Sequence, residues 1–178
     1  MSNERLSIVV PVFNEQESLP ECHQRLSMVL ATIGMEYEVV YVNDGSVDQS
    51  WSILQQLRQA DNRVALLDLS RNFGKEIALS AGLDVAEGDA VVVMDADLQD
   101  PPELIPKLVE QWRAGFDVVY AKRTARQNES WMKKTTAAMF YRVLGGVSRV
   151  HIPADTGDFR ILSHRAVLAL RSIVATPS

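Results

Sequence analysis

The sharpest chemical signal in the sequence is the segment Asp95-Ala96-Asp97-Leu98-Gln99, which follows the apolar run Val91–Met94. In extended backbone, residues two positions apart face the same side, so two carboxylates and one amide oxygen can converge. Oxygen ligands of this kind suit Mg²⁺ or Mn²⁺, which keep several waters and take the rest of their shell from substrate phosphates. Two aspartates separated by one residue are common in surface loops, but their place after an apolar strand is a stronger indication. The segment therefore predicts a divalent-cation site.

Three other apolar runs also end in polar residues. These polar segments are Asn14-Glu15, Asn43-Asp44-Gly45-Ser46 and Arg71-Asn72-Phe73-Gly74. In open α/β sheets, ligands bind beyond the carboxyl ends of the strands. A sheet without a function at that edge would scatter such residues to both edges. The pattern therefore predicts a functional edge built from four loops.

The sequence lacks the two commonest phosphate-binding loops. It has no G-x-G-x-x-G after the first strand and no G-x-x-x-x-G-K-[ST], which excludes the usual dinucleotide-binding and P-loop sites. A phosphate must then be held by a metal and by basic side chains. Arg123, Arg126, Lys133 and Lys134 follow the fifth apolar run and could supply them. For each one singly, a solvated surface charge is an equally good interpretation.

The strands that must position these loops are nearly continuous apolar, β-branched runs. They are Leu6–Phe13, Glu38–Val42, Val64–Leu69, Ala90–Met94 and Asp117–Ala121. Helical spacing lies between them, at about 17–33, 48–60, 74–86 and 102–114. This alternation predicts the α/β class, with a mainly parallel sheet covered by helices on both faces. Ser46 and Gln49 form a capping-box pattern for the second helix, and Pro102 suits the first turn of the fourth.

The pattern changes after Ala121. We expect a polar loop over 122–130, a helix over 131–144, a short strand or turn over 155–162 and a last helix over 164–173. The helix over 131–144 mixes apolar side chains with Lys133, Lys134 and Arg142. Such a helix is either plain amphipathic packing or a membrane-surface element that meets a lipid phosphate.

Composition bounds the possible functions. The 178 residues are 47% apolar and 23% charged, which fits one globular domain, and no apolar run is long enough to cross a bilayer. Met1–Arg5 lacks the apolar core of a signal peptide, and the single cysteine, Cys22, suits a reducing cytoplasm. We expect Cys22 to be a bystander, Trp112 and Phe116 to pack in the core or at a helix end, and the histidines to have surface or structural roles. These histidines are His23, His151 and His164.

The net charge of −5 is unevenly distributed. Residues 1–100 hold 6 Lys and Arg against 17 Asp and Glu, whereas residues 101–178 hold 12 against 6. This asymmetry indicates that one part handles a metal or a hydroxyl-rich ligand and the other an anion, although solvated charge is the commoner cause.

The motifs together resemble glycosyltransferases of family two with the GT-A fold, a Rossmann-like architecture. The stretches that carry the resemblance are Pro11–Glu15, Val42–Asp48, Asp95–Pro102 and Asp155–Arg160. The last stretch and the basic loop before it are similar to the polyprenyl-phosphate branch, which includes dolichol-phosphate mannose synthases and bactoprenol glucosyltransferases. The resemblance covers about 6–173. It implies one catalytic domain over 1–178, with a nucleotide-sugar and metal half over 1–121 and an acceptor half over 122–178.

The resemblance also implies roles for single residues. Pro11, Phe13 and Glu15 would line the nucleotide site, Asp44 would read the base, and Asp95 would lie near the ribose and diphosphate. Asp97 and Gln99 would hold Mg²⁺ or Mn²⁺. Asn43 departs from the pattern, since many relatives have Asp there, and this affects only the fine tuning of base or ribose contacts.

In the acceptor half, Arg123 would meet a donor or acceptor phosphate, and Arg126 and Lys134 would add substrate contacts. The stretch Asp155–Arg160 would face the acceptor, with Asp158 as the candidate base and Arg160 as a phosphate contact. A phosphate monoester with a second pKa of about 6 is already mostly a dianion at neutral pH. We therefore expect Asp158 to orient the acceptor rather than to act as an obligatory base.

The implied reaction is an inverting transfer of a hexose from a UDP- or GDP-sugar to undecaprenyl or dolichyl phosphate, at the cytoplasmic face of the inner membrane. Relatives continue into amphipathic and transmembrane helices that this chain lacks, so we expect a soluble fragment of a longer membrane protein. A soluble glycosyltransferase or nucleotidyltransferase with a water-soluble acceptor is the alternative. A non-catalytic nucleotide-sugar-binding module is a third reading, against which the complete motif set argues. No nucleic-acid partner is expected, and the sugar, the polyprenol and a homo-oligomer are left open.

Overall fold

The computed structural model describes residues 4–122, 131–135 and 159–174. Its strands form one sheet in the order β3-β2-β1-β4-β7-β5-β6. The strands are β1 Arg5–Val12, β2 Glu36–Asn43, β3 Val64–Asp68, β4 Ala90–Val93, β5 Val118–Lys122, β6 Trp131–Thr135 and β7 Arg160–Ser163. Neighbours among β1 to β4 pair in parallel, whereas β7 pairs antiparallel with both β4 and β5, and β6 antiparallel with β5. The sheet is therefore mainly parallel, as predicted.

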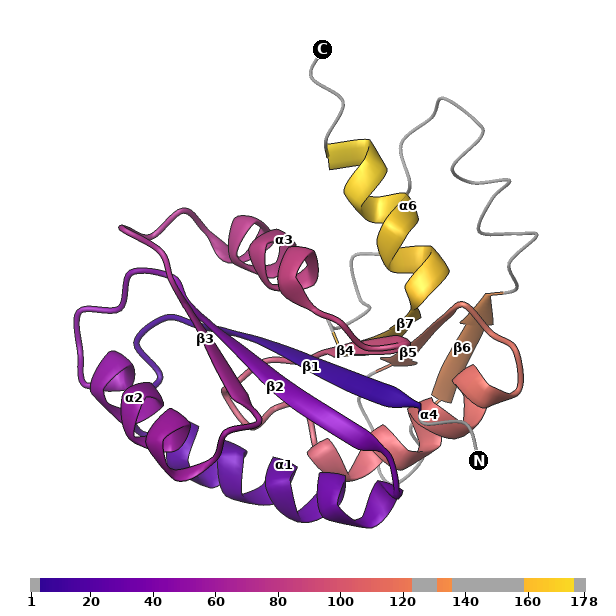
Figure 1. The fold of residues 1–178 in the computed structure, drawn as a ribbon, viewed down its shortest axis with the longest axis horizontal. Coiled ribbons are helices and arrows are strands. Elements are labelled where there is room, and N and C mark those ends of the chain that lie inside the picture. Colours follow the sequence, from indigo (N-terminus) through magenta and orange to yellow (C-terminus); the bar gives the residue numbers. More distant parts are fainter. Residues whose placement is uncertain (1–3, 123–130, 136–158, 175–178) are drawn as a thin grey trace.

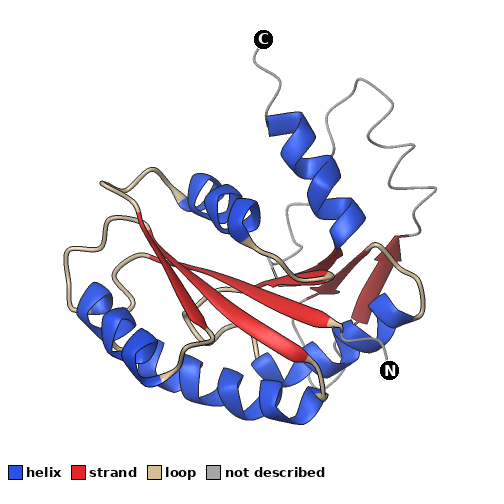
Figure 2. Ribbon diagram, viewed as in Figure 1, coloured by secondary structure: helices blue, strands red, loops and turns tan. Residues whose placement is uncertain are grey.

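Helices cover both faces of this sheet (Figures 1 and 2). They are α1 Leu19–Ile33, α2 Ser50–Ala60, α3 Lys75–Val85, the short η1 Pro102–Leu104, α4 Ile105–Arg113 and α6 His164–Val174. Apolar side chains of α1, α2 and α4 share one core cluster, and those of α3 and α6 share the other. The predicted α/β class and the helices within the first 114 residues are confirmed, including Pro102 at the start of the fourth helical segment.

The alternation of side chains along β1 explains why one sheet carries two cores. Ile8 and Val10 belong to the cluster under α1, α2 and α4, whereas Val9 between them belongs to the cluster under α3 and α6. In the parallel register, Ile8 lies opposite Val92 and Val9 opposite Val93, so neighbouring strands keep the same alternation. Successive residues of a strand face opposite sides. Runs without polar interruption are therefore what a doubly covered sheet requires.

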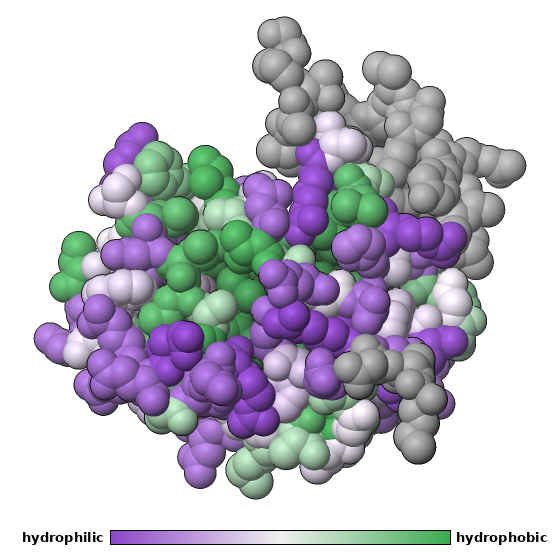
Figure 3. All heavy atoms as spheres, in the orientation of Figure 1, coloured by the Kyte–Doolittle hydropathy of each residue, from purple (hydrophilic) through white to green (hydrophobic). Residues whose placement is uncertain are grey.

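Helix α3 lies unusually close to the sheet because it carries Gly82. A Cβ on Gly82 would lie 3.0 Å from Cγ2 of Val42 and would overlap Cγ1 of Val9. The outer side of α3 stays partly open, with Ile77 and Val85 exposed, and apolar side chains gather over this helix in Figure 3. The close approach packs the second half of α3 directly against β1 and β2.

Two local predictions are wrong. Residues 131–135 form strand β6, not the first part of a helix over 131–144, and residues 136–144 lie outside the described part of the chain. Antiparallel pairing with β5 satisfies the backbone of this segment at the sheet edge, which outweighs a weak helical periodicity. The described residues therefore give no support to an amphipathic helix starting at Trp131.

The capping box is the second wrong prediction. Helix α2 begins at Ser50 without a side-chain cap. The Ser46 hydroxyl instead accepts a hydrogen bond from the Asn14 backbone N–H at 3.0 Å, and the Gln49 N–H donates to the side-chain oxygen of Gln16 at 3.0 Å. The Ser46 hydroxyl and the Gln49 N–H thus bond to the first loop instead of forming a local cap. No helix among the described residues has the length and apolarity that a membrane crossing needs.

Candidate functional site

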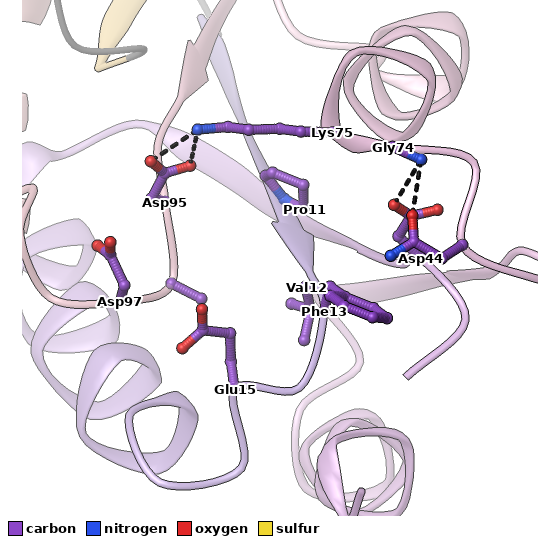
Figure 4. A pocket seen from close by; sticks show the side chains of 11 residues that line it. Pro11, Val12, Phe13, Glu15, Asp44, Gly74, Lys75, Asp95 and Asp97 are labelled. Atoms are coloured by element: carbon purple, nitrogen blue, oxygen red, sulfur yellow. Dashed lines mark hydrogen bonds and ion pairs between the residues drawn. The ribbon is translucent and has the colours of Figure 1, made fainter. Parts of the chain in front are cut away.

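The loops after β1, β2, β3 and β4 meet around a cavity of about 360 Å³. All four loops contribute to its lining, together with the end of β1 and the start of α3: Pro11, Val12, Phe13, Glu15, Asp44, Asn72, Gly74, Lys75, Asp95, Ala96 and Asp97. In Figure 4, Pro11 and Phe13 stand between Asp44 on one side and Asp95 and Asp97 on the other. The structure therefore brings together Pro11, Phe13 and the four predicted carboxylates at the expected edge of the sheet.

Glu15 is positioned by hydrogen bonds between the first and second loops. Asn14 adopts a left-handed backbone with φ of 55°, and its side-chain oxygen accepts the Val47 N–H at 2.9 Å. The Glu15 N–H donates to the Ser50 hydroxyl at 2.8 Å, and the Ser18 hydroxyl donates to the Glu15 carboxylate at 2.7 Å. The Glu15 carboxylate is thus aimed at the cavity from a loop held at both of its ends.

Asp44 joins the second loop to the third. Its buried carboxylate accepts the backbone N–H groups of Phe73 at 2.8 Å and of Gly74 at 3.0 Å (Figure 4). The next residue, Gly45, has a φ of 68°, and a Cβ there would overlap the backbone of Arg71. A carboxylate offers about four acceptor positions, so Asp44 can hold the loop and still accept from a ligand.

The loop after β4 is bent, which corrects the extended geometry expected for Asp95 to Gln99. Leu98 has a φ of 64°, and the Asp97 carboxylate accepts the Gln99 N–H at 3.0 Å. The buried Asp100 closes the loop by accepting the Asp95 N–H at 3.3 Å. Asp95 and Asp97 consequently face the cavity, while Gln99 is exposed and is not one of its lining residues. Gln99 as a metal ligand stays a prediction.

Lys75 is a site residue that the sequence interpretation missed. Its ammonium lies 2.6 Å from Oδ1 and 2.7 Å from Oδ2 of Asp95, so it contacts both carboxylate oxygens. Both side chains are half-buried at the cavity wall (Figure 4). The polar segment recognised after the third strand stopped one residue short, at Gly74. Charge balance was the available signal, because an edge this rich in carboxylates needs a cation before it can hold a phosphate.

The donor set of the cavity fits a divalent cation that is shared with a substrate. Within the described ranges, no group of three or more His, Cys, Asp or Glu is arranged to hold a metal by itself. Glu15, Asp95 and Asp97 nevertheless bring carboxylate oxygens to one cavity. Mg²⁺ and similar ions are usually bound by one or two carboxylates plus substrate phosphates and waters, rather than by a closed protein cage. These residues fit such an ion.

A second cavity of about 620 Å³ adjoins the first, with Phe13 and Asn72 lining both. Asn43 lines this second cavity and is itself buried. Its amide donates to Asp68 at 2.7 Å, and its oxygen accepts the Ser46 N–H at 3.2 Å. An aspartate at position 43 could not donate to Asp68. The Asn43 amide therefore has a structural role, since it joins the end of β3 to the second loop.

The predicted acceptor residues are described only in part. Arg123, Arg126, Asp155 and Asp158 lie outside the described residues, and for Lys134 only the backbone is described, in β6 opposite Val119. Arg160 begins β7, opposite Val93 at the carboxyl end of β4. Within the described part of the chain, its Nε is buried and has no hydrogen-bond partner. Arg160 thus lies at the same sheet edge as Asp95.

Cys22 and His23 are not among the lining residues of either cavity. Burial raises the pKa of the Cys22 thiol to about 12, so it stays protonated at neutral pH. His23 is half-buried on α1, its Nδ1 lies 2.9 Å from the Tyr41 hydroxyl, and burial lowers its pKa. Trp112 and Phe116 pack against the core, as predicted.

Comparison with known proteins agrees with this arrangement. The family model "Glycosyl transferase family 2" matches residues 7–170. An uncharacterized glycosyltransferase from Synechocystis sp. is 49% identical over 168 residues, which are 94% of this chain and 53% of that protein. The bactoprenol glucosyl transferase of Shigella phage SfV is 45% identical over 163 residues, 92% of this chain and 53% of that protein. The chain spans about half the length of these curated relatives.

A solved structure extends the comparison to three dimensions. The mannosyltransferase PcManGT from Pyrobaculum calidifontis, in complex with GDP-Man and Mn²⁺, superposes with a TM-score of 0.68 at 21% identity. The match covers 96% of this chain and 47% of that one. At this level of identity the likeness concerns the fold.

Proposed function

The chain belongs to glycosyl transferase family 2 and has the GT-A fold, and from this premise we propose that it transfers a hexose from a nucleotide-diphosphate sugar to a polyprenyl phosphate, with inversion. The 45% identity to a bactoprenol glucosyl transferase supports the acceptor class. Such an acceptor implies action at the cytoplasmic face of the inner membrane. The single observation that carries the proposal is the cavity where Glu15, Asp44, Asp95 and Asp97 converge at the carboxyl edge of the sheet.

In this proposal, residues 1–121 bind the nucleotide sugar and the metal. Pro11 and Phe13 give the donor an apolar surface, and Phe13 is 43% exposed where the two cavities meet. Asp44, held by the third loop, reads the base, and Asp95 lies near the ribose and diphosphate. This arrangement orients the anomeric carbon toward the acceptor half, residues 122–178.

A divalent cation, Mg²⁺ or Mn²⁺, completes the proposed donor site. Asp97 would hold it, with Gln99 and the neighbouring carboxylates as further oxygen ligands. When bound, the cation would offset the negative charge that develops on the nucleoside-diphosphate leaving group. The likeness to a GT-A structure that contains Mn²⁺ supports a divalent metal in this fold.

The acceptor half acts on a phosphate. Arg160 supports a phosphate contact at the carboxyl end of β4, because its buried Nε has no hydrogen-bond partner among the described residues. We assign Arg123 a catalytic contact to a donor or acceptor phosphate, and Arg126, Lys134 and Asp155 further substrate contacts. Because the acceptor phosphate is mostly a dianion at neutral pH, Asp158 orients it and deprotonates only the minor monoanion.

The experiment is a donor panel on the full-length protein that contains this chain. UDP- and GDP-sugars are supplied with Mn²⁺ or Mg²⁺ and a short polyprenyl phosphate, and the glycolipid product is measured. We expect product with one nucleotide and one sugar, and loss of product in EDTA. Product only with water-soluble acceptors, without liposome binding, would favour the soluble glycosyltransferase. Consumption of a nucleoside triphosphate with no sugar transfer would favour nucleotidyl transfer.

Asp158 is tested separately by its pH–rate profile. We expect Asp158→Asn to keep measurable activity that grows as the pH rises from 6 to 9 and the acceptor monoanion disappears. Inactivity at every pH up to 9, with donor binding intact, would show that Asp158 is an obligatory base instead.

A further inference from the structure

We propose that Lys75 binds the diphosphate of the donor, and that it does so from an ion pair with Asp95 that lets an anion approach an otherwise acidic cavity. The inference deepens the proposed function and rests on its donor class. It concerns a residue outside the motifs that carry the family resemblance. Three observations support it: the charge of the cavity, the place of the ammonium, and the way α3 is fixed.

The charge of the cavity sets the problem. Glu15, Asp44, Asp95 and Asp97 all line it, and among the described lining residues Lys75 is the one cation. The diphosphate of a nucleotide sugar adds about two negative charges, and the departing nucleoside diphosphate carries more. One divalent cation balances only part of this total. A fixed ammonium beside the diphosphate would balance a further part of it.

The ammonium of Lys75 lies where it could supply this positive charge. It contacts both oxygens of Asp95, the carboxylate proposed to lie near the ribose and diphosphate. A lysine ammonium has three donors, so it can contact a carboxylate and a phosphate oxygen together. In Figure 4 its side chain extends from the start of α3 across the cavity to Asp95, past Pro11. The ion pair thus keeps the Lys75 ammonium beside the donor site.

The base of the Lys75 side chain is also fixed. Lys75 is the first residue of α3, directly after Gly74, whose N–H is held by Asp44. The Ile77 and Ala78 N–H groups bond to the Gly74 carbonyl oxygen at 3.1 Å, which closes the first turn. Gly82 brings this helix close against β1 and β2. The ammonium is therefore carried by a rigid element and needs little ordering when a ligand binds.

The test measures binding of UDP and GDP by calorimetry, in Mn²⁺ and without acceptor, using whichever nucleotide the wild-type protein binds. We expect Lys75→Met to weaken nucleoside-diphosphate binding by about 10- to 100-fold and to leave binding of the parent nucleoside within about twofold. Lys75→Arg, which keeps the charge, should recover most of the loss. Lys107→Met, a charge removal on the exposed side of α4, is the matched control and should behave as wild type.

A double variant distinguishes two roles of Lys75: direct contact with the phosphate, and neutralisation of the Asp95 charge. Lys75→Met with Asp95→Asn restores the net charge of the cavity but lacks the ammonium. If Lys75 contacts the diphosphate, the double variant binds more weakly than Asp95→Asn alone. Recovery to wild-type affinity would overturn the proposal, as would an equal loss of nucleoside and nucleoside-diphosphate binding in Lys75→Met, which indicates a structural role only.

These outcomes are distinct from a failure of the proposed function. If wild-type protein binds the nucleoside diphosphate but transfers no sugar to a polyprenyl phosphate, the acceptor assignment fails and the role of Lys75 stands. If Lys75→Met unfolds, Lys75→Gln and Lys75→Arg are compared, since both keep a long polar side chain and only the second keeps the charge. Equal nucleotide affinity in those two variants would also overturn the proposal.

Discussion

The two ends of the central strands both carry acidic side chains, and they use them in opposite ways. At the amino end, Glu38 is buried and its carboxylate is surrounded by donors. Ser7 donates to it at 2.5 Å, the Glu87 N–H at 2.9 Å and Arg5 at 2.8 Å. Every oxygen of this carboxylate is engaged inside the protein. Glu38 therefore has a structural role.

Asp117 repeats this arrangement at the amino end of β5. It is buried and accepts from the Ser163 hydroxyl at 2.6 Å and from Arg165 at 2.9 Å. At the carboxyl end, by contrast, Glu15, Asp95 and Asp97 are half-buried around a cavity. Acidic side chains alone therefore do not identify a ligand site. A carboxylate is available for a ligand only where the fold leaves it facing open volume.

The largest effect should come from Asp97→Asn, which tests the carboxyl end. The change removes the charge proposed to hold the metal, so we expect transfer to fall by about 10²- to 10³-fold, equivalent to about 3–4 kcal/mol of transition-state stabilisation. The free energy of unfolding, measured in urea without ligand, should change by less than about 0.5 kcal/mol. A fully active variant, or one as destabilised as it is inactive, would contradict the assignment of Asp97 to the site.

At the amino end, Glu38→Ala should act on stability instead. It leaves Ser7 and the Glu87 N–H without their acceptor and leaves Arg5 with the Glu87 carboxylate alone, so we expect the free energy of unfolding to fall by about 3 kcal/mol. Urea unfolding followed by circular dichroism measures this loss, and Glu110→Ala, at an exposed position on α4, is the control. Donor affinity per folded molecule should stay unchanged. A selective loss of donor binding would contradict the assignment of a purely structural role to Glu38.

Asp117→Asn should have a smaller effect of the same kind. The amide keeps the shape and one acceptor oxygen for Ser163, but it loses the charged pair with Arg165, whose side chain is mostly exposed. We expect a loss of about 1–2 kcal/mol in the free energy of unfolding. If salt above 0.5 M abolishes the difference between wild type and variant, the pair acts as a surface charge rather than as a buried link.

The smallest effect should be a pH dependence from His23, which belongs to neither end. Burial lowers its pKa in the folded protein below the ordinary value of 6.5. As the pH falls, the unfolded chain takes up this proton before the folded protein does. The contribution of neutral His23 to the free energy of unfolding is therefore complete above pH 6.5 and is lost as the pH falls through the folded-state pKa. We expect unfolding free energy to be lower at pH 5.5 than at pH 7.5 by up to about 1 kcal/mol. His23→Gln should flatten the profile, whereas His164→Gln, at an exposed position, should not.

Much of the framework could be predicted from residue patterns. The runs at Leu6–Phe13 and Ala90–Met94 are apolar at nearly every buried position, with Ser7 as the exception, because a strand covered on both faces has no solvent side. Loops after such strands gather at one edge of a parallel sheet, so Glu15, Asp44, Asp95 and Asp97 could be assigned to one site without coordinates. Short segments with a tertiary partner were the failures. Trp131–Thr135 pairs with β5, and Ser46 bonds across to the first loop.

The fold class, the edge that carries the site and the residues that first indicate its chemistry could be recognised from residue patterns, because they follow from periodicity and from the order of strands and loops. Only the tertiary structure decided which charges meet. It placed Lys75 on Asp95, gave Asp100 and Asn43 structural roles, and enclosed Glu38 and Asp117 among donors. The reason is physical: a periodic pattern records which face of an element is buried, whereas a polar side chain is defined by partners that lie far away in sequence.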